Sequence, residues 1–240
     1  MIKTKFGSIF SHKFNNEYIC YDTSIQPILK SRIIDSLKSD EFRLSNRSNI
    51  LDLNNGFIKK HFWRKGAVSV FNDNYIFLGL KSSRPIRELI NYIDFLHIVK
   101  ASENQFIIDK IEVCIPIFAY IKKNTIFYKG DIILSKINGM TLDVYLQTRN
   151  MNKSFEMEIA HCFGFMFSNG IYNFDMNLKN IIYNTDSQKL AFIDFDKVLI
   201  DSAKKNNKKY ITRVLNKFKR SLEYYKSLRN FNYNKFINYL

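Results

Sequence analysis

The sequence predicts an α+β protein with two lobes, of which the first is rich in β-strands and the second is mainly helical. Short apolar runs bounded by turn residues, which are typical of strands, dominate the first half of the chain, with one helical segment among them. Apolar residues at helical spacing dominate the second half, and Asn138-Gly139 breaks the chain between the two. We therefore expect one lobe over 1–137, weakly patterned over 1–50, and a second over 138–240.

Length and composition predict a folded protein in a reducing compartment. The 240 residues are 46% hydrophobic and 15% aromatic, which is too apolar for a disordered basic chain. Cys20, Cys114 and Cys162 form no CxxC pair, so neither a disulfide framework nor a zinc site is indicated. No signal-peptide pattern follows Met1, and the longest apolar stretches are much shorter than the ~20 residues that span a bilayer. We expect a cytoplasmic protein.

Two strands and one helix are expected between residues 57 and 96. Phe57–Trp63 and Tyr75–Leu78 have the composition of strands. Ser82-Ser83-Arg84-Pro85 indicates a helix start, because hydroxyl side chains followed by proline are favoured in a first turn. Apolar residues from Ile86 to Leu96 then recur at helical spacing.

The following segments complete the first lobe and open the second. Val113–Ile121 and Ile126–Ile137 are strand-rich, and Lys122–Thr125 between them is expected to form a hairpin turn. After the break, Thr141–Leu146 predicts a short helix and Phe155–Phe167 a long buried one.

A predicted β-hairpin brings together the polar residues that carry chemistry. Ile181–Tyr183 and Leu190–Ile193 are short apolar strands, and Asn184–Ser187 has turn composition. Asn180 enters the first strand and Asp194 leaves the second, so we expect their side-chain oxygens to lie close enough to share one cation. An amide and a carboxylate oxygen, completed by water and phosphate, suit Mg²⁺.

A third polar residue, Asp175, precedes Asn180 by five positions in the same loop. The chain thus has the order Asp-x4-Asn, then a hairpin, then Asp-Phe-Asp. Phosphoryl transfer by protein-kinase-like enzymes requires this arrangement, in which one aspartate accepts the proton of the acceptor and an Asn and an Asp bind the metal. The alternative interpretation is an ordinary polar loop whose carboxylates cap turns. The order and spacing of Asp175, Asn180 and Asp194 favour the catalytic interpretation.

From about Phe57 to about Tyr225, the chain resembles the bacterial lipopolysaccharide kinases, and most closely the 3-deoxy-D-manno-octulosonic acid (Kdo) kinases. The matching segments are Lys60–Gly66, Tyr75–Leu80, Ser83-Arg84 with Glu88, Phe127–Ile137, Asp175–Ile182, Ile193–Lys197 and Leu215–Ser221. The resemblance implies a protein-kinase-like two-lobe fold and a Mg²⁺-dependent enzyme that moves the γ-phosphate of ATP to a Kdo sugar hydroxyl on a lipid A precursor.

The resemblance also implies roles for individual residues. Lys60 takes the place of the strand cation that holds the phosphates of ATP, and Glu88 that of the helix carboxylate that pairs with it. Asp175 takes the place of the catalytic base, and Asn180 and Asp194 those of the metal ligands. A solvated Lys60 and a Glu88 that opposes the helix macrodipole are the alternatives.

The chain departs from the family pattern at two places. Asn173 stands where the family has His, two residues before the catalytic aspartate, so a positioning hydrogen bond is expected to be altered or lost. The phosphate-covering loop expected over 44–49 contains no glycine, although backbone N–H groups approach phosphate most readily at glycine. Both departures keep a pseudokinase open as an alternative, and the sequence does not decide whether Asp196 contacts a metal or orients the loop.

Other lysine and histidine residues of both lobes are expected to have structural roles. Lys59 lies on the opposite strand face from Lys60, and it is expected to be the solvated lysine of the two. His61 and His161 lie in apolar sequence surroundings and are expected to be packed core histidines. The chain has 4 His, so a His-based metal site is improbable.

The positive charge is concentrated near the C-terminal end. The formal net charge is +15 with a pI near 9.6, and residues 204–229 contain ten Lys or Arg and one Glu, which is nine of these fifteen charges. Because apolar residues from Ile211 to Leu222 form a helical stripe, this segment is expected to pack on the second lobe and display a basic face. A solvated face is the simplest interpretation, and an anionic membrane or nucleic acid are the alternatives; no nucleic-acid-binding motif is visible.

The function expected from the sequence is therefore an ATP- and Mg²⁺-dependent kinase of a lipid-linked Kdo sugar, peripheral to the cytoplasmic face of the bacterial inner membrane through its basic C-terminal helix. A small-molecule kinase of the aminoglycoside or choline type, a pseudokinase acting as a binding module and a nucleic-acid binder are the rivals. The sequence leaves the acceptor hydroxyl and the oligomeric state open.

Overall fold

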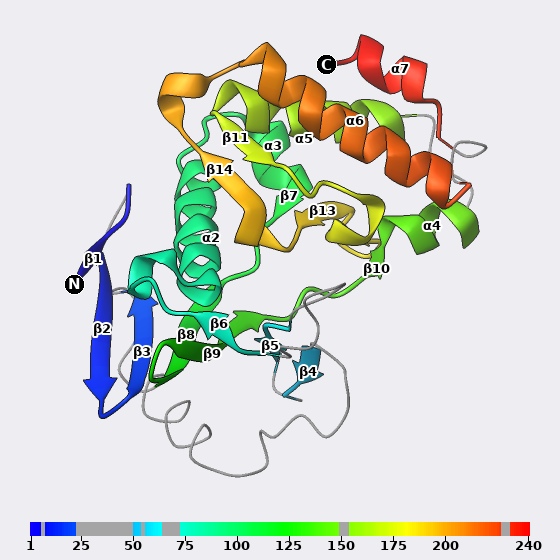
Figure 1. The fold of residues 1–240 in the computed structure, drawn as a ribbon. Helices are drawn as coiled ribbons and strands as arrows, with labels where there is room; N and C mark the ends of the chain where they lie inside the picture. The colour runs from blue at the N-terminus through cyan, green and yellow to red at the C-terminus, as the bar shows by residue number, and fades with distance from the viewer. Residues whose placement is uncertain (6–7, 23–49, 54–55, 64–72, 149–153, 227–230) are drawn as a thin grey trace. The chain divides into compact units, whose positions relative to one another are not determined.

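The computed structural model describes residues 1–5, 8–22, 50–53, 56–63, 73–148, 154–226 and 231–240 (Figure 1). The chain divides into two compact units: unit 1 consists of Met1–Ile93 and Ile115–Lys136, and unit 2 of Asp94–Cys114 and Ile137–Leu240. Within the described residues, unit 1 is mainly a β-sheet and unit 2 is mainly helical. The predicted α+β fold class is therefore confirmed.

Unit 1 is built on an antiparallel sheet. Its described strands are, in spatial order, β1 (Ile2–Lys3), β2 (Ser8–Phe14), β3 (Glu17–Asp22), β8 (Pro116–Asn124), β9 (Phe127–Ser135), β5 (Phe57–His61) and β4 (Ile50–Asp52), and β6 (Tyr75–Ile76) pairs with β9. Ile19, Tyr21, Ile117, Phe118 and Ile133 form a buried cluster on β3, β8 and β9. The sheet thus joins strands from both segments of unit 1.

Two parts of this sheet differ from the sequence-based expectation. The stretch described as weakly patterned contains β1 to β3. β2 exposes both aromatic and polar side chains, Phe10, His12, Lys13 and Phe14, so its sequence shows no regular alternation, and its ladder with β3 defines the strand. The β8–β9 turn was expected over Lys122–Thr125, whereas β8 continues to Asn124, which pairs with Phe127. The turn is therefore tighter, with Thr125 at φ 51°.

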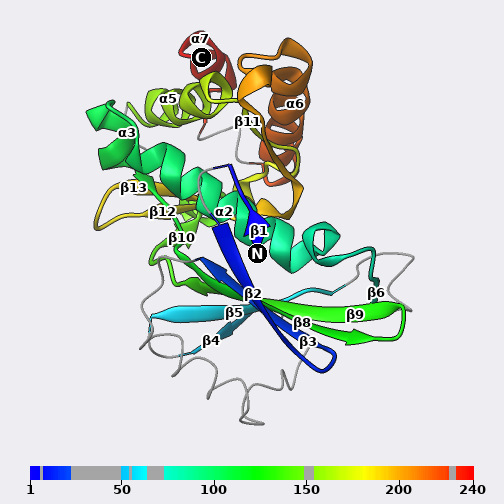
Figure 2. The same ribbon diagram turned by 90° about the vertical axis from the view of Figure 1, so that its left-hand side faces the viewer.

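Helix α2 (Arg84–Lys100) begins where hydroxyls followed by proline predicted a helix start. Its first turn approaches β9 closely, since a Cβ on Gly130 would lie 2.5 Å from Pro85 Cγ. The backbone N–H of Arg84 also donates to the Tyr128 hydroxyl at 2.9 Å. These contacts fix the start of α2 against the sheet, and Figure 2 shows the first half of the helix along one face of the strands.

The segment from Asp94 to Cys114 belongs to unit 2, although the sequence analysis placed it in the first lobe. It contains the second half of α2, helix α3 (Gln105–Lys110) and strand β7 (Ile111–Glu112). Of these, α3 was not expected from the sequence. β7 pairs in parallel with a strand of unit 2, and Lys110 forms an ion pair with Glu158 at 3.0 Å. A two-residue strand has no sequence periodicity of its own, so only its partner reveals it.

Unit 2 contains helices α4 (Leu142–Thr148), α5 (Phe155–Ser168), α6 (Lys208–Tyr224) and α7 (Tyr233–Asn238). Its core is aromatic: the Phe163 ring lies 5.1 Å from that of Phe218, 5.5 Å from Phe236 and 6.0 Å from Phe192. Because offset and edge-to-face rings pack tightly, these contacts hold α5, α6 and α7 together. None of the described helices has the length and hydropathy needed to span a bilayer.

Two small sheets in unit 2 hold the loops of the candidate site. The first has the order β10 (Met140–Thr141), β12 (Ile181–Asn184), β13 (Lys189–Phe192) and β7, and β12–β13 is the predicted hairpin. The second pairs β11 (Ile171–Asn173) with β14 (Val198–Ile200). The 3-10 turns η4 (Leu178–Asn180), η5 (Phe195–Lys197) and η6 (Ser202–Lys204) lie beside these strands.

Candidate active site

Asp175 stands in the loop that leaves β11. Gly170 directly precedes this strand, and its φ of +70° and close approach to the Asp201 carbonyl leave no room for a side chain. The β11–β14 ladder is continued by a bond from the Phe174 N–H to the Lys197 carbonyl at 3.3 Å. As a result, Asp175 comes next to the end of the Asp194–Lys197 segment.

Hydrogen bonds within the loop hold the backbone of Asp175 from both sides. Its N–H donates to Asn173 Oδ1 at 2.9 Å, and its carbonyl accepts from Asn177 Nδ2 at 2.8 Å and from Asn180 Nδ2 at 2.9 Å. Asn173 is 1% exposed. Asn173 was expected to alter or lose a positioning hydrogen bond; in the structure its amide oxygen accepts a hydrogen bond from the backbone N–H of Asp175.

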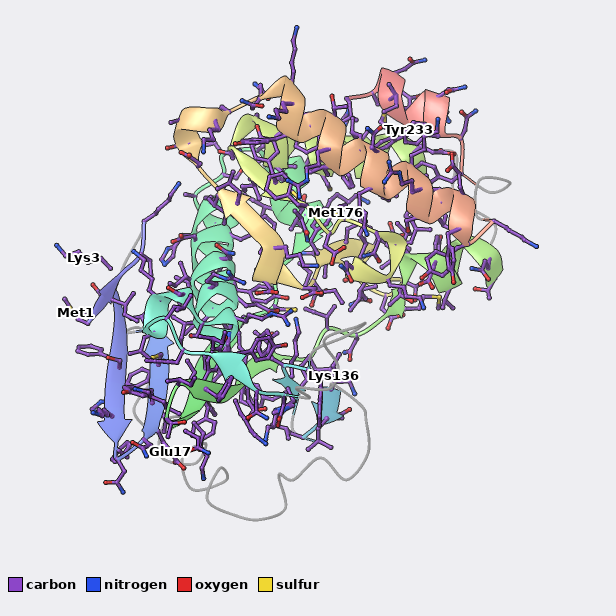
Figure 3. All side chains as sticks on the ribbon, in the orientation of Figure 1. Met1, Lys3, Glu17, Lys136, Met176 and Tyr233 are labelled. Atoms are coloured by element: carbon purple, nitrogen blue, oxygen red, sulfur yellow. The ribbon has the colours of Figure 1, made fainter. Side chains whose placement is uncertain are left out.

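The loop that contains Asp175 is anchored to α6. Met176 and Leu178 are fully buried, and Leu178 donates its backbone N–H to Ser221 Oγ at 2.8 Å. Figure 3 labels Met176 next to α6. Because two apolar side chains and a buried hydrogen bond fix the loop, Asp175 is presented on a rigid support.

The carboxylate of Asp175 is paired with two lysines. Lys197 Nζ lies 3.0 Å from Oδ2 and Lys217 Nζ lies 3.2 Å from Oδ1. Partial burial would raise the pKa of Asp175, but the hydrogen bonds and charges of the two lysines outweigh burial and hold this pKa below its ordinary value. The group is therefore ionised at neutral pH and can accept a hydrogen bond from a hydroxyl.

Asn180 and Asp194 stand at the open end of the β12–β13 hairpin, as the sequence predicted. The Ile193 N–H donates to the Asn180 carbonyl at 2.9 Å, one step beyond the Ile181–Phe192 pair. Asp194 has φ 62° and ψ 68°, a left-handed conformation that is unfavourable for a residue with a side chain. Such strained residues cluster at functional sites.

The side-chain oxygen atoms at this end of the hairpin are of the kind that binds a magnesium ion. Since the Asn180 amide nitrogen is bonded to the Asp175 carbonyl, its Oδ1 is the atom left to accept or to bind a cation. Asp194 adds a carboxylate, and both are the hard oxygen ligands that Mg²⁺ prefers. Within the described part of the chain, no three His, Cys, Asp or Glu side chains form a metal cluster.

In unit 1, the structure brings Lys60 and Glu88 together. Lys60 Nζ lies 2.8 Å from both carboxylate oxygens of Glu88, whose side chain is 0% exposed. The Phe62 ring lies under two cations, 5.2 Å from Lys60 Nζ and 5.2 Å from the Arg84 guanidinium. The strand lysine and the early helix glutamate thus form the ion pair that the sequence led us to expect.

The sequence-based expectations for Lys59 and His161 were wrong, and that for His61 holds only in that both ring nitrogens have partners. Lys59 is not solvated: it is 7% exposed and lies 3.5 Å from Asp131. His61 is not surrounded by apolar groups, because Nδ1 lies 2.6 Å from Asp131 and Nε2 lies 3.2 Å from Asp73. His161 is exposed on α5. Strand alternation places Lys59 and His61 on the face opposite Lys60, where two buried carboxylates balance them.

Other expectations remain open, and some functional groups were missed. The glycine-poor segment 44–49 lies outside the described residues. Asp196 is 6% exposed, which does not decide between a metal contact and loop orientation. Sequence reasoning did not assign a role to Lys197, although it directly follows the Asp-Phe-Asp motif, or to Lys217, which is 42 positions from Asp175 and has no local signal.

Comparisons with known proteins give a family and several relatives. A family model described as the lipopolysaccharide kinase (Kdo/WaaP) family matches residues 29–239. A Vibrio parahaemolyticus protein named 3-deoxy-D-manno-octulosonic acid kinase is 27% identical over 165 residues, which cover 68% of this chain and 64% of the relative. The Vibrio cholerae protein of the same name is 28% identical over 165 residues, covering 66% and 64%. The chain thus spans slightly less than two thirds of the length of these two curated relatives.

Among solved structures, the bifunctional kinase–methyltransferase WbdD is similar over 62% of this chain and 29% of its own, with a TM-score of 0.37 and 15% sequence identity.

Proposed function

Because the chain belongs to the lipopolysaccharide kinase (Kdo/WaaP) family, we propose that it transfers the γ-phosphate of ATP to a Kdo sugar hydroxyl of a lipid A precursor in lipopolysaccharide biosynthesis. One observation carries this proposal. The side chain of Asn180 donates a hydrogen bond to the Asp175 carbonyl, and Asn180 and Asp194 lie at the open end of the same β12–β13 hairpin. The names of the relatives support Kdo as the acceptor.

In the proposed reaction, Asp175 accepts the proton of the acceptor hydroxyl while the hydroxyl oxygen attacks the γ-phosphorus and the bond from phosphorus to the leaving oxygen of ADP breaks. Its side chain is 25% exposed, so a substrate hydroxyl can reach it. The hydrogen bond that its backbone N–H donates to Asn173, and those that its carbonyl accepts from Asn177 and Asn180, keep the carboxylate oriented. Orientation of this kind reduces the entropy lost in the transition state.

The proposal assigns the remaining site residues to the phosphate donor. When bound, Mg²⁺ would neutralise charge on the transferring phosphoryl group. Asn180 Oδ1 and the Asp194 carboxylate would hold it. Lys60 binds phosphate oxygens of ATP, and the buried Glu88 keeps its ammonium group in place.

The catalytic assignment is tested by Asp175→Asn, which keeps the size of the side chain but removes its basicity. We expect phosphorylation of a Kdo-bearing lipid A precursor, followed by mass spectrometry, to fall about 100- to 10,000-fold, with an unchanged circular dichroism spectrum. Asp186→Asn, on the exposed hairpin turn, serves as the control with full activity. Wild-type turnover in the Asp175→Asn variant would exclude Asp175 as the base.

The acceptor class is tested with the wild-type protein. Turnover of the Kdo-bearing lipid is to be compared with turnover of an aminoglycoside and of choline at equal concentration. Preference for either small molecule would replace the proposed acceptor. Binding of ATP without turnover of any acceptor would indicate a pseudokinase.

We further propose that α6 holds the protein at the anionic cytoplasmic face of the inner membrane. The helix contains six Lys or Arg and one Glu, and it buries Val214, Phe218 and Leu222. These buried residues confirm the predicted apolar stripe. Four of its cations are exposed and neither pair with Asp175, as Lys217 does, nor stack on Phe174, as Arg213 does: Lys208, Lys209, Lys219 and Arg220. Near an anionic bilayer each cation contributes about 1 kcal/mol, so together they provide reversible attachment.

Vesicle flotation tests this attachment. Gln substitution of Lys208, Lys209, Lys219 and Arg220 together is expected to abolish binding to vesicles that contain anionic phosphatidylglycerol. Gln substitution of four exposed lysines of unit 1, Lys3, Lys13, Lys81 and Lys122, removes the same charge and is the control. Equal loss in both variants would mean that only net charge matters and would contradict a role for α6. Stronger binding of the wild type to RNA than to vesicles at physiological salt would favour the nucleic-acid alternative.

A further inference from the structure

The carboxylate of Asp175 lies between two ammonium groups that come from different elements of unit 2. Lys197 is the last residue of η5, and Lys217 lies in the middle of α6. Each carboxylate oxygen has its own lysine, at 3.0 Å for Lys197 and 3.2 Å for Lys217. We call Lys197 and Lys217 the lysine fork.

Stability does not account for the lysine fork. The side chains of Lys197 and Lys217 are 59% and 45% exposed. Ion pairs with this exposure contribute only about 0–1 kcal/mol to stability.

Proton transfer does not account for the lysine fork either. Two ammonium groups stabilise the ionised carboxylate, and so they oppose the uptake of a proton by Asp175. A reaction that needs only a base at this position is better served without them. The two cations therefore fit another anion that arrives with the substrate.

We propose that the lysine fork binds the carboxylate of the acidic sugar acceptor and thereby places the neighbouring hydroxyl at Asp175. This inference rests on the proposed function, since the acceptor named there is an octulosonic acid whose carboxylate and hydroxyl groups belong to the same sugar. An ammonium group has three donors, so Lys197 and Lys217 can each bind the incoming carboxylate while one donor still contacts Asp175. Hydrogen bonds between charged partners are about twice as strong as neutral ones.

The surroundings of the lysine fork also favour an anion. Arg213, one turn before Lys217 on α6, stacks on the ring of Phe174, with its guanidinium carbon 4.3 Å from the ring centroid. Phe174 is the residue before Asp175, so a third cation stands beside the loop. The acid of α6, Glu223, is almost two turns beyond Lys217. An acidic acceptor thus meets positive charge on the α6 side of Asp175.

The experiment pairs each enzyme variant with two soluble acceptors that lack phosphate: a Kdo glycoside and the same glycoside with its carboxylate converted to a carboxamide. With the wild type, we expect kcat/KM to be about 10- to 100-fold lower for the carboxamide. Lys197→Ala and Lys217→Ala are expected to lose a similar factor with the acid but to differ little from wild type with the carboxamide. Lys189→Ala, whose ammonium group donates to the Ile108 carbonyl at 3.2 Å, removes one charge elsewhere in unit 2 and is the control.

Two outcomes would overturn the inference. One is an equal loss with both acceptors, which would mean that the lysines only position Asp175. The other is activity of both lysine variants like that of wild type on the acid. A double-mutant cycle combines the lysine substitution with the change of the acceptor from acid to carboxamide. A large interaction energy in this cycle is expected if the lysine contacts the carboxylate, and a small one if it does not.

A binding measurement decides the matter without turnover. Titration calorimetry of the Kdo glycoside into the Lys197→Ala/Lys217→Ala double variant is expected to show binding weakened at least 10-fold relative to wild type, and Lys189→Ala unchanged binding. Unchanged binding in the double variant would contradict the lysine fork as an anion site. If the wild type binds the acid but phosphorylates no acceptor, the proposed kinase function fails while the anion site stands.

Discussion

At the scale of single residues, the candidate site depends on charges whose partners differ in burial. Glu88 is completely buried and pairs with Lys60 at 2.8 Å, whereas Asp52 and Lys136 form a pair at the surface, at 2.5 Å. Because water screens the second pair and not the first, the same chemical contact has different consequences for stability.

Replacement of Lys60 by Met is expected to lower the free energy of unfolding by about 3 kcal/mol, since it removes the ion pair that Lys60 forms with the completely buried Glu88 carboxylate. The double variant Lys60→Met/Glu88→Leu should regain most of this stability while ATP binding stays weak. Urea unfolding and nucleotide titration give the two readouts. Lys136→Met is the control, with a loss of less than about 1 kcal/mol; a comparable loss there would refute the role of burial.

The titration of Asp175 carries a pH-dependent prediction. Its pKa is below the ordinary value because Lys197 and Lys217 outweigh partial burial. A depressed carboxyl pKa contributes stability that is present above the unfolded-state pKa of about 3.9 and is lost as pH falls through the folded-state pKa. Lys197→Ala or Lys217→Ala should raise the Asp175 pKa, measured by carbon NMR of the carboxyl group, so that acid unfolding starts at a higher pH. A pKa that does not move would show that the ion pairs do not persist in solution.

At the scale of elements, short strands and one helix position the loop that contains Asp175. β11 delivers the loop, β14 returns beside it, and α6 anchors it through Ser221. The hairpin, α5 and the apolar stripe of α6 were predictable from local patterns. β7, β11 and β14 were not, because strands of two or three residues carry too few positions to show alternation.

The anchor between α6 and the loop is tested by Ser221→Ala. This change leaves the buried Leu178 N–H without its acceptor, so we expect a loss of about 1–3 kcal/mol in unfolding free energy and a lower kcat. Ser168→Ala removes an exposed hydroxyl that donates to the Phe165 carbonyl and should change stability by less than about 0.5 kcal/mol. If both variants unfold at the same urea concentration, Ser221 is not an anchor.

The turn that starts β11 is tested by a pair of glycine variants. A Cβ at Gly170 would lie 2.0 Å from the Asp201 carbonyl oxygen, and φ is +70°, so Gly170→Ala should destabilise the protein and lower activity by displacing the loop. Gly164 lies in α5 with open space around its Cα. Gly164→Ala should therefore stabilise the protein by about 0.5–1 kcal/mol. Thermal unfolding of the two variants should shift in opposite directions, and a shift in the same direction would contradict this account.

At the scale of the whole molecule, the sequence by itself determined the α+β class, the family resemblance and the identities of Asp175, Asn180, Asp194, Lys60 and Glu88 as candidate site residues. Local chemistry carries these features: hydrophobic period, turn residues and the spacing of polar groups within one loop and hairpin. Only the tertiary structure decided that Lys217 lies against Asp175, that Asn173 binds the Asp175 N–H, and that Asp94–Cys114 belongs to unit 2. Each of these depends on where a chain segment returns in space or on how a side chain turns, and such contacts are set by packing rather than by any pattern within a single element.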